Sequence, residues 1–380
     1  MRLRVRRREH TFVGLIALFF IVGMVGVNTM WPTGFSTFVA IGGAVGALMV
    51  LYEVRLTKAI AQAEFIRDLQ TSFATDSQVM ALWSKMLRGE EITAHDRPLM
   101  SSYLTFFETI YLLQIRGALD LGMIDDLFRN RFFTAVGHPA VLEHALLKSA
   151  SAFVNIHALI DEWYRYIASC GVPLHPGYFA YLRSVAASKG LEIRELDVAD
   201  IDALMGLQGA VMAAMPDRRW LRENSRESFL DCLGGGRARA VDAVADSDAG
   251  VTGHLVLGAW SEGKLVSAAI LFDPGDGPES IKRYLTDDSA ALADAVNLKL
   301  VLADPSYRRA RGGTVLVKLL EERVYEMGRA EILCTIHPRN AASIGLFTSL
   351  GYSRVGRARA SYGSRAIYSR RIRRPKTYAL

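Results

Sequence analysis

The chain has 380 residues, of which 51% are hydrophobic, and a formal net charge of +6. This length allows two or three domains, and the apolar composition excludes a disordered chain. Three distant cysteines without CxxC spacing and eight histidines without an HExxH motif predict neither a disulfide framework nor a metal site.

Five arginines occur among the first eight residues, and a long stretch without charge follows. No charged residue occurs from Thr11 to Tyr52. This stretch could hold two membrane spans of about 20 residues each, at about 11–30 and 35–52, joined by a Trp-Pro-Thr-Gly turn. We therefore expect residues 1–56 to form a two-span transmembrane helical hairpin. A cleaved signal peptide and a buried soluble hairpin are the alternatives.

Basic residues predict the orientation of this hairpin. Arginines precede the first span, the turn carries no charge, and Arg55 and Lys58 follow the second span. Because basic loops stay in the cytoplasm, both termini are predicted to be cytoplasmic, in a multi-pass protein of the inner or plasma membrane. Gly42 and Gly46 form a GxxxG pattern, which would allow the spans to pack together or a homodimer to form.

Residues 57–172 show helical periodicity throughout and carry no catalytic motif. We predict a cytoplasmic helical domain that serves as a stalk or an interaction domain. The aromatic residues from Tyr103 to Tyr111 recur at helical spacing, which favours a core over a ligand groove. A linker is expected at 173–190.

After the linker, strand and helix patterns alternate. A short strand is followed by two helices, and "GHLVLGAW" and "LVSAAILFD" form a hairpin around a Glu-Gly turn. Then come a strand ending at Pro305, a helix, the strand "EILCTI", a second helix and two closing strands. This order predicts an α/β domain at 191–372 with a mixed sheet and helices on both faces. A basic tail, 373–380, follows; no nucleic-acid-binding motif accompanies the basic residues, so nucleic acid is an unlikely partner.

A basic loop follows the strand that ends at Pro305. It reads "SYRRARGGT" and leads into a helix, so backbone N–H groups, the positive end of a helix dipole and arginines surround one place. Gly312 and Gly313 would let the backbone approach a ligand closely. The loop is neither a Walker loop nor a dinucleotide fingerprint. It predicts an anion site that suits a pyrophosphate, although an ordinary basic surface turn is the alternative.

A second motif, "IHPRNAASIGLFTSLGY", places a strand end, a helix-capping Asn340 and a short helix in sequence. The basic loop and this motif together resemble the GNAT acetyltransferase superfamily over roughly residues 190–372. The resemblance implies a GNAT-like acyltransferase domain that holds acetyl-CoA, its co-substrate, where the fourth and fifth strands diverge. The loop departs from the family pattern, because it fits either as Arg308, Arg311 and Gly313 or one residue later.

The resemblance implies that the following residues bind acetyl-CoA: Leu300, Val301, Leu302 and Ala303 at the pantetheine, Arg308, Arg309, Arg311, Gly312, Gly313 and Thr314 at the pyrophosphate, and Asn340, Ser343 and Phe347 in the second motif.

The same resemblance implies a general base and a general acid. Many relatives use an acidic residue on the fourth strand, where this chain offers only Asn297, Lys299 and Asp304. The usual tyrosine acid is replaced by Phe347. The catalytic residues therefore stay unassigned, and Asp304, Tyr325 and Tyr352 are weak candidates.

These patterns predict a membrane-anchored, GNAT-type N-acetyltransferase, which transfers an acetyl group, and not an aminoacyl group, to an amine. The acceptor would be a small molecule, a protein or a lipid-linked amine, and residues 234–250 and 273–295 would shape its pocket or form solvated loops. The alternative is a non-catalytic sensor or scaffold that binds an acyl-CoA at the membrane.

Overall fold

The computed structural model describes residue 23 and residues 32–149, 151–242, 254–360 and 363–372, without the side chains of 32–45, 235–242, 308–310 and 360. The chain divides into two units, residues 1–71 and 72–380.

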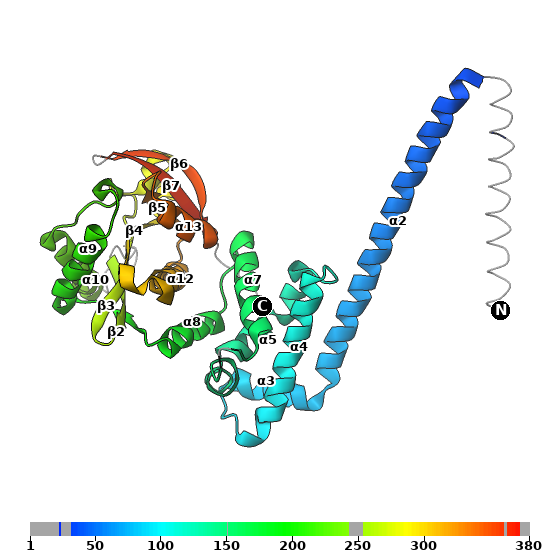
Figure 1. Cartoon of the computed structure of the whole chain (residues 1–380), viewed down its shortest axis with the longest axis horizontal. Helices are drawn as coiled ribbons and strands as arrows, with labels where there is room; N and C mark the ends of the chain where they lie inside the picture. The colour runs from blue at the N-terminus through cyan, green and yellow to red at the C-terminus, as the bar shows by residue number, and fades with distance from the viewer. Residues whose placement is uncertain (1–22, 24–31, 150, 243–253, 361–362, 373–380) are drawn as a thin grey trace. The chain divides into compact units, whose positions relative to one another are not determined.

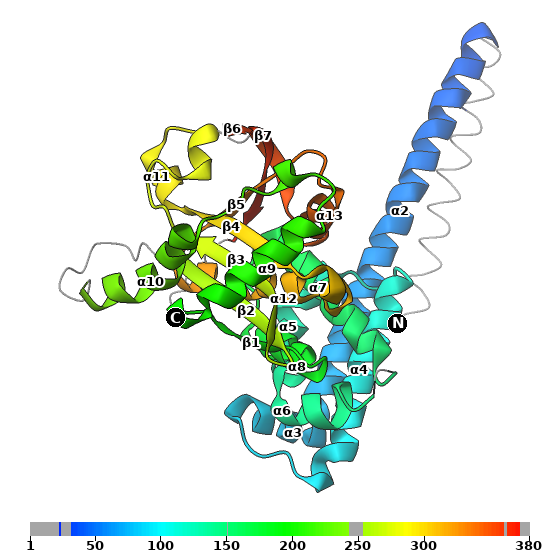
Figure 2. The same cartoon turned by 60° about the vertical axis from the view of Figure 1, so that its left-hand side comes forward.

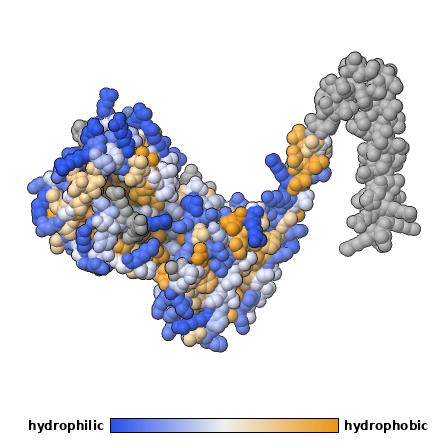
Figure 3. Space-filling model, in the orientation of Figure 1, coloured by the Kyte–Doolittle hydropathy of each residue, from blue (hydrophilic) through white to orange (hydrophobic). Residues whose placement is uncertain are grey.

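The first unit contains most of helix α2, Pro32–Thr75 (Figures 1 and 2). The four consecutive residues Leu48, Met49, Val50 and Leu51 are between 58% and 66% exposed, and they belong to the apolar patch on α2 in Figure 3. Four residues cover a full helical turn. This part of α2 is therefore apolar on every side, unlike an ordinary surface helix with one apolar stripe.

The described residues include no helix that meets both the length and the apolarity needed to cross a membrane. Apart from Gly23, the predicted span at 11–30 lies outside the described residues. The predicted span at 35–52 falls within α2, where side chains are described only from residue 46 onward. The transmembrane hairpin therefore stays a prediction.

The second unit begins with a helical part. Its elements are α3 (Ser77–Arg88), η1 (Ala94–Asp96), α4 (Arg97–Ile115), α5 (Leu121–Gly137), α6 (Pro139–Val141), η2 (Leu142–Leu146), α7 (Val154–Cys170) and α8 (Pro176–Ser188). The aromatic residues of α4 pack on those of α5, which pack in turn on α7. Phe107 meets Phe132 with ring centroids 5.0 Å apart, and Phe132 stacks on Trp163 at 4.9 Å. They form a core, as their helical spacing predicted.

The predicted linker at 173–190 contains helix α8, and this corrects the expectation of a plain connection. His175 caps α8, because its Nδ1 accepts a hydrogen bond of 3.0 Å from Gly177 N. Tyr178 and Phe179 are buried. A Cβ on Gly177 would lie 1.9 Å from the carbonyl oxygen of Phe133, so only glycine lets α8 start against α5. The proline and glycine that suggested a linker instead begin this helix.

The rest of the unit is a seven-stranded mixed sheet, as the sequence predicted. The strands are β1 (Glu192–Glu195), β2 (His254–Ser261), β3 (Lys264–Phe272), β4 (Ala295–Ala303), β5 (Glu331–Ile336), β6 (Ser353–Ala360) and β7 (Gly363–Arg371). Their order is β1-β2-β3-β4-β5-β7-β6. Only β4 and β5 pair in parallel, and the other neighbours are antiparallel.

Helices cover both faces of this sheet (Figures 1 and 2). They are α9 (Ile201–Ala213), α10 (Arg226–Asp242), α11 (Ser289–Ala293), α12 (Gly312–Glu326) and α13 (Ala341–Ser349), with short 3₁₀ turns η3 (Val198–Asp200), η4 (Arg218–Trp220), η6 (Ile281–Tyr284) and η7 (Pro305–Ala310). Leu300 and Leu302 pack in a core with α9 and α10 residues. Gly313 of α12 faces Val301, the residue between them. Successive residues of β4 therefore face helices on opposite sides of the sheet.

A buried polar cluster joins the helical part to the sheet part. Arg370 on β7 and Glu321 on α12 form an ion pair of 2.6 Å, with side chains only 3% and 0% exposed. Tyr164 on α7 donates a hydrogen bond of 3.3 Å to Glu321 and accepts one from Arg370. Burial raises the pKa of Glu321 to about 7. The helical part thus contacts α12 directly.

Candidate functional site

Strands β4 and β5 separate partway along their length. They pair only where Ala295–Asn297 lies beside Glu331–Leu333. Beyond these residues β4 continues to Ala303 and β5 continues to Ile336. The facing edges there have no strand partner for their peptide groups, which remain strong hydrogen-bonding groups. An extended ligand can pair with these edges, so this divergence has the form that the sequence predicted.

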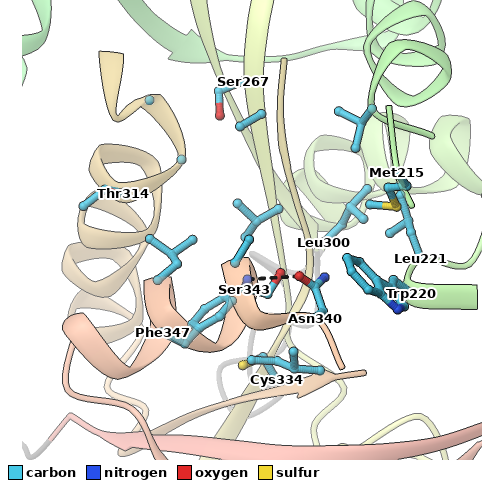
Figure 4. Close-up of a pocket in the computed structure, with 18 of the residues that line it drawn as sticks. Met215, Trp220, Leu221, Ser267, Leu300, Thr314, Cys334, Asn340, Ser343 and Phe347 are labelled. Atoms are coloured by element: carbon cyan, nitrogen blue, oxygen red, sulfur yellow. Dashed lines mark hydrogen bonds between the residues drawn. The ribbon is translucent and has the colours of Figure 1, made fainter. Parts of the chain in front are cut away.

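A cavity of about 610 Å³ occupies this divergence. Its walls come from β3, β4, β5, the start of α12, the first two turns of α13 and the segment between α9 and α10. In Figure 4, Thr314 and Phe347 lie on one side of the cavity and Met215, Trp220 and Leu221 on the other. A cavity of this size suits a small-molecule ligand.

The start of α12 provides an anion site at one side of the cavity. Arg311, Gly312, Gly313 and Thr314 all line it. The first amides of an α-helix have no acceptor within the helix and point outward with the positive end of the dipole. Arg311 adopts a left-handed backbone with φ 56°, which turns the chain into the helix. This arrangement suits the pyrophosphate that the basic loop predicted.

The two glycines have a second role that the sequence did not reveal. A Cβ on Gly312 would lie 3.0 Å from the Cβ of Ser267, and a Cβ on Gly313 would lie 3.3 Å from Val301 Cγ1. Ser267 itself donates a hydrogen bond of 2.6 Å to the carbonyl oxygen of Leu302. Small residues therefore bring the first turn of α12 against β3 and β4, and this contact positions its amides at the cavity.

Only some of the other predicted loop and strand residues line the cavity in the described part of the chain. Arg308 and Arg309 lie in η7, and their side chains are outside the described part of the chain. On β4, Leu300, Val301 and Ala303 line the cavity. Leu302 is not among the described lining residues, and its side chain is fully buried in the core with α9 and α10 residues. The expected contact of the pantetheine with its backbone stays a prediction.

The second motif lies at the cavity as predicted. Asn340 Oδ1 accepts a hydrogen bond of 3.1 Å from Ser343 N and so caps α13 (Figure 4). Asn340, Ser343 and Phe347 all line the cavity. The Phe347 ring meets the Tyr352 ring edge to face, with centroids 5.0 Å apart. Phe347 therefore forms an apolar wall where many relatives would carry a tyrosine hydroxyl.

None of the three candidate catalytic residues lines the cavity. Asp304 is tied to Lys264 by an ion pair of 2.6 Å, and this hydrogen bond holds the pKa of Asp304 below its usual value. Tyr325 lines a separate small cavity of about 20 Å³ beside Glu321 and Arg370. Tyr352 lies behind Phe347, and its buried hydroxyl has no hydrogen-bond partner among the described residues.

The carboxylate-free fourth strand offers only one ionisable residue to the cavity. Asn297 is buried and structural, because its side chain donates to Glu279 O at 2.8 Å and accepts from Ile281 N at 3.2 Å. Lys299 lines the cavity. The other described ionisable residues in the lining are Tyr307, Arg311, Cys334 and His337. Burial raises the pKa of Cys334, so its thiol stays neutral. No aspartate or glutamate is among the described lining residues.

The sequence did not single out the apolar wall or His337. Trp220 lies in η4, within a segment that shows no periodic pattern. His337 follows β5, stacks on Trp220 at 6.4 Å between ring centroids, and accepts a hydrogen bond of 3.2 Å at Nδ1 from Arg339 N. A neutral His337 therefore carries its proton on Nε2. Trp220 and His337 are far apart in the sequence, so residue spacing could not reveal their contact.

Of the two segments that were expected to shape an acceptor pocket, 273–295 lies elsewhere. No residue of 273–295 lines the cavity. Instead Ile281 and Leu285 of this segment pack on a small core with Leu333, Ala358 and Ile367. Most of 234–250 lies outside the described side chains. The segment 273–295 is thus a covering layer for the β5–β7–β6 part of the sheet.

Comparison with known proteins places this domain in a family. Residues 219–352 match the model of the acetyltransferase (GNAT) family. No protein with a curated description matches the chain significantly. The chain thus contains a GNAT acetyltransferase domain in its C-terminal part, as the sequence resemblance predicted.

Solved structures that resemble the chain are acetyltransferases. The ribosomal-protein-S18-alanine N-acetyltransferase from Escherichia coli is 19% identical, with a TM-score of 0.33, over 50% of this chain and 99% of that one. The paia N-acetyltransferase from Thermoplasma acidophilum, in complex with coenzyme A, is 18% identical, with a TM-score of 0.33, over 48% and 98%. The putative acetyltransferase yncA from Salmonella typhimurium, with acetyl-CoA, is 20% identical, with a TM-score of 0.33, over 50% and 97%.

Proposed function

We propose that the protein is a membrane-anchored N-acetyltransferase that transfers an acetyl group from acetyl-CoA to an amine. One observation carries the proposal: the divergence of β4 from β5 opens a cavity that the first turn of α12 also lines. The family match over residues 219–352 supports the same reaction class. An acetyl group, and not an aminoacyl group, is the proposed cargo.

In this proposal acetyl-CoA spans the cavity in an extended form. Its pyrophosphate binds the first amides of α12 and the Arg311 guanidinium, which combine a helix dipole with a fixed positive charge. Its pantetheine pairs with the free edge of β4 between Leu298 and Ala303. The thioester then lies in the divergence, beside Asn340 and Phe347, which line that part of the cavity.

The transfer itself needs a neutral amine. The amine nitrogen forms a C–N bond with the thioester carbonyl carbon, the C–S bond breaks, and coenzyme A leaves as a thiol after receiving the proton that the amine gives up. The described lining offers no carboxylate base. We propose that the amine enters the cavity in its neutral form, so that the transfer needs no carboxylate base.

The membrane anchor remains part of the proposal because of the amino-terminal sequence. Residues 11–52 contain no charge, and the apolar residues Leu48–Leu51 of α2 are exposed on every side of the helix. A lipid environment would cover such a surface. We propose a multi-pass protein of the inner or plasma membrane with cytoplasmic termini, possible acceptors being small molecules, proteins or lipid-linked amines. A reporter fused after residue 33 should give no cytoplasmic signal, and a cytoplasmic signal there would refute the hairpin.

A second function is favoured by Phe347. This residue places an apolar ring where a hydroxyl could protonate the leaving thiolate, and the described lining has no carboxylate. A non-catalytic sensor that binds an acyl-CoA would need neither group. Binding of acetyl-CoA without release of coenzyme A in the presence of any amine would favour this sensor.

Calorimetric titration of the full chain with acetyl-CoA tests the cofactor assignment. We choose Thr314→Glu because Thr314 lines the cavity in the first turn of α12. A carboxylate there stabilises the helix dipole, so the variant should fold, but it repels a pyrophosphate. We expect its affinity to fall about tenfold or more, as for the loss of one charge-assisted hydrogen bond. Thr314→Gln is the matched uncharged control. An unmodified chain that does not bind acetyl-CoA would overturn the proposal.

A further inference from the structure

The side of the cavity opposite α12 is apolar. It is lined by Met215, Trp220 and Leu221, from the segment between α9 and α10 (Figure 4). This wall is apolar and aromatic. If acetyl-CoA occupies the α12 side, as proposed above, then the acceptor meets this wall. The inference below therefore rests on the proposed function and concerns the class of acceptor.

Lys299 is the only ionisable residue of β4 that lines the cavity. In the β3–β4 register Ile270 pairs with Leu300 and Leu271 pairs with Leu298, so Lys299 is an extra residue in a β-bulge. A bulge redirects the side chain that it carries. The bulge lies just past Asn297, the last residue of β4 that pairs with β5. Lys299 is therefore held where the strands begin to diverge.

The ammonium group of Lys299 has no anionic partner among the described residues. Its contacts are Cys232 Sγ at 3.7 Å and the Phe272 ring, whose centroid is 5.6 Å from Nζ. Burial raises the pKa of Cys232, which keeps the thiol neutral. The exposed carboxylates Asp231 and Glu279 lie in the neighbourhood but do not line the cavity. The charge of Lys299 thus remains available to a ligand.

Basic side chains also lie near the His337 end of this wall. His337 stacks on Trp220, and partial burial followed by the charge of Arg365 lowers the pKa of His337. Arg219 and Arg339 lower this pKa further. The nearby carboxylate, Asp217, raises it, but Arg219 already holds Asp217 at 2.8 Å. The lowered pKa favours the neutral form of His337, so the positive charge near this wall belongs to arginines that do not line the cavity.

We propose that the acceptor is an anionic amine, whose carboxylate or phosphate pairs with Lys299 and whose apolar group packs on Met215, Trp220 and Leu221. Amino acids with an apolar side chain and amines that bear a phosphate, including lipid headgroups, share this chemistry. The acetyl group moves from sulfur to the amine nitrogen, and the proton that the amine loses leaves with coenzyme A as its thiol. A cationic or neutral amine lacks the group that this side recognises.

Binding of matched amines tests this assignment without requiring turnover. L-phenylalanine and phenethylamine share a ring and an amine, but only phenylalanine has a carboxylate. We expect the full chain, titrated calorimetrically with coenzyme A present, to bind phenylalanine about tenfold more tightly, as for one hydrogen bond to a charged group. Lys299→Gln should abolish this preference and Lys299→Arg should keep it. Lys189→Gln, an exposed lysine at the end of α8, is the control.

A second pair of probes distinguishes the sources of the anion. O-phosphoethanolamine represents a free phosphate, and lysophosphatidylethanolamine represents a lipid headgroup with its apolar chain. Tighter binding of either one than of ethanolamine, with dependence on Lys299, supports the assignment and names the source.

Three results would overturn the inference. Phenethylamine could bind as tightly as phenylalanine, Lys299→Gln could leave the preference unchanged, or none of these amines could bind while a protein is acetylated. The titration with acetyl-CoA on the same preparation separates these results from a failure of the proposed function. Absence of acetyl-CoA binding would refute the cofactor site, whereas its presence with no anionic preference would refute only the acceptor class.

Discussion

The buried cluster between the helical part and the sheet part allows a quantitative prediction about stability. Arg370 and Glu321 are 3% and 0% exposed at their side chains and lie 2.6 Å apart. Replacing one member of such a pair leaves the other charge buried without its partner, which typically costs about 3–5 kcal/mol. We therefore expect Glu321→Leu and Arg370→Met each to lower the free energy of unfolding by about this amount.

The double variant should cost much less than the sum of the two. When both charges are removed, the remaining losses are the hydrogen bonds of Leu350 and Tyr164. Arg370 donates to the Leu350 carbonyl oxygen, at 2.6 Å, and to Tyr164, and Tyr164 donates to Glu321. A buried acceptor left without a partner costs about 1–3 kcal/mol. If the losses of unfolding free energy in the two single variants simply added, their sum would be about 6–10 kcal/mol. The coupling free energy should therefore reach about 3 kcal/mol.

Urea unfolding of the full chain, followed by circular dichroism, measures this coupling. The unchanged chain, both single variants and the double variant form one cycle, and equal m-values would indicate that the denatured state is unaffected. Tyr164→Phe serves as a milder probe of the same cluster. If the two single costs simply add, within about 0.5 kcal/mol, then the pair does not hold α7 and α12 together as described.

Two further changes test the structure around α8. The pKa of His175 is lowered to about 4, with burial as the largest cause. The unfolded chain therefore binds a proton at His175 in a pH range where the folded chain does not, so the free energy of unfolding should fall as the pH drops from about 6.5 to about 4. His175→Asn keeps the helix cap and should flatten this slope in thermal melts. An unchanged slope would exclude His175 as its source. Gly177→Ala would place Cβ 1.9 Å from Phe133 O and should lower the melting temperature by several degrees, while Gly209→Ala, with nothing within 4 Å, should not lower it.

Much of the sheet could be predicted from sequence, because local signals determine its elements. The β2–β3 hairpin follows from two apolar runs around Glu262-Gly263, and the start of α13 follows from Asn340, whose side chain caps the helix. The divergence of β4 from β5 was predicted only through the family resemblance. Its position after Asn297 depends on the pairing of distant strands.

The parts that escaped prediction depend on long-range packing. Helix α8 starts with Pro176-Gly177, which locally resembles a turn, and only its contact with α5 explains the glycine. The pairing of Arg370 with Glu321 joins residues from two elements that are not adjacent in sequence. The rings of Trp220 and His337 stack although these residues lie 117 positions apart in the sequence. No periodic pattern could have indicated these contacts.

Hydrogen exchange measured with and without acetyl-CoA tests the central claim most directly. Amides of residues 298–303 on β4 and 312–314 at the start of α12 border the cavity, and bound ligand should protect them. We predict that acetyl-CoA slows exchange in both segments of the unchanged chain, and that Thr314→Glu needs a much higher concentration for the same effect. Binding of acetyl-CoA that leaves both segments unprotected would contradict the proposed site.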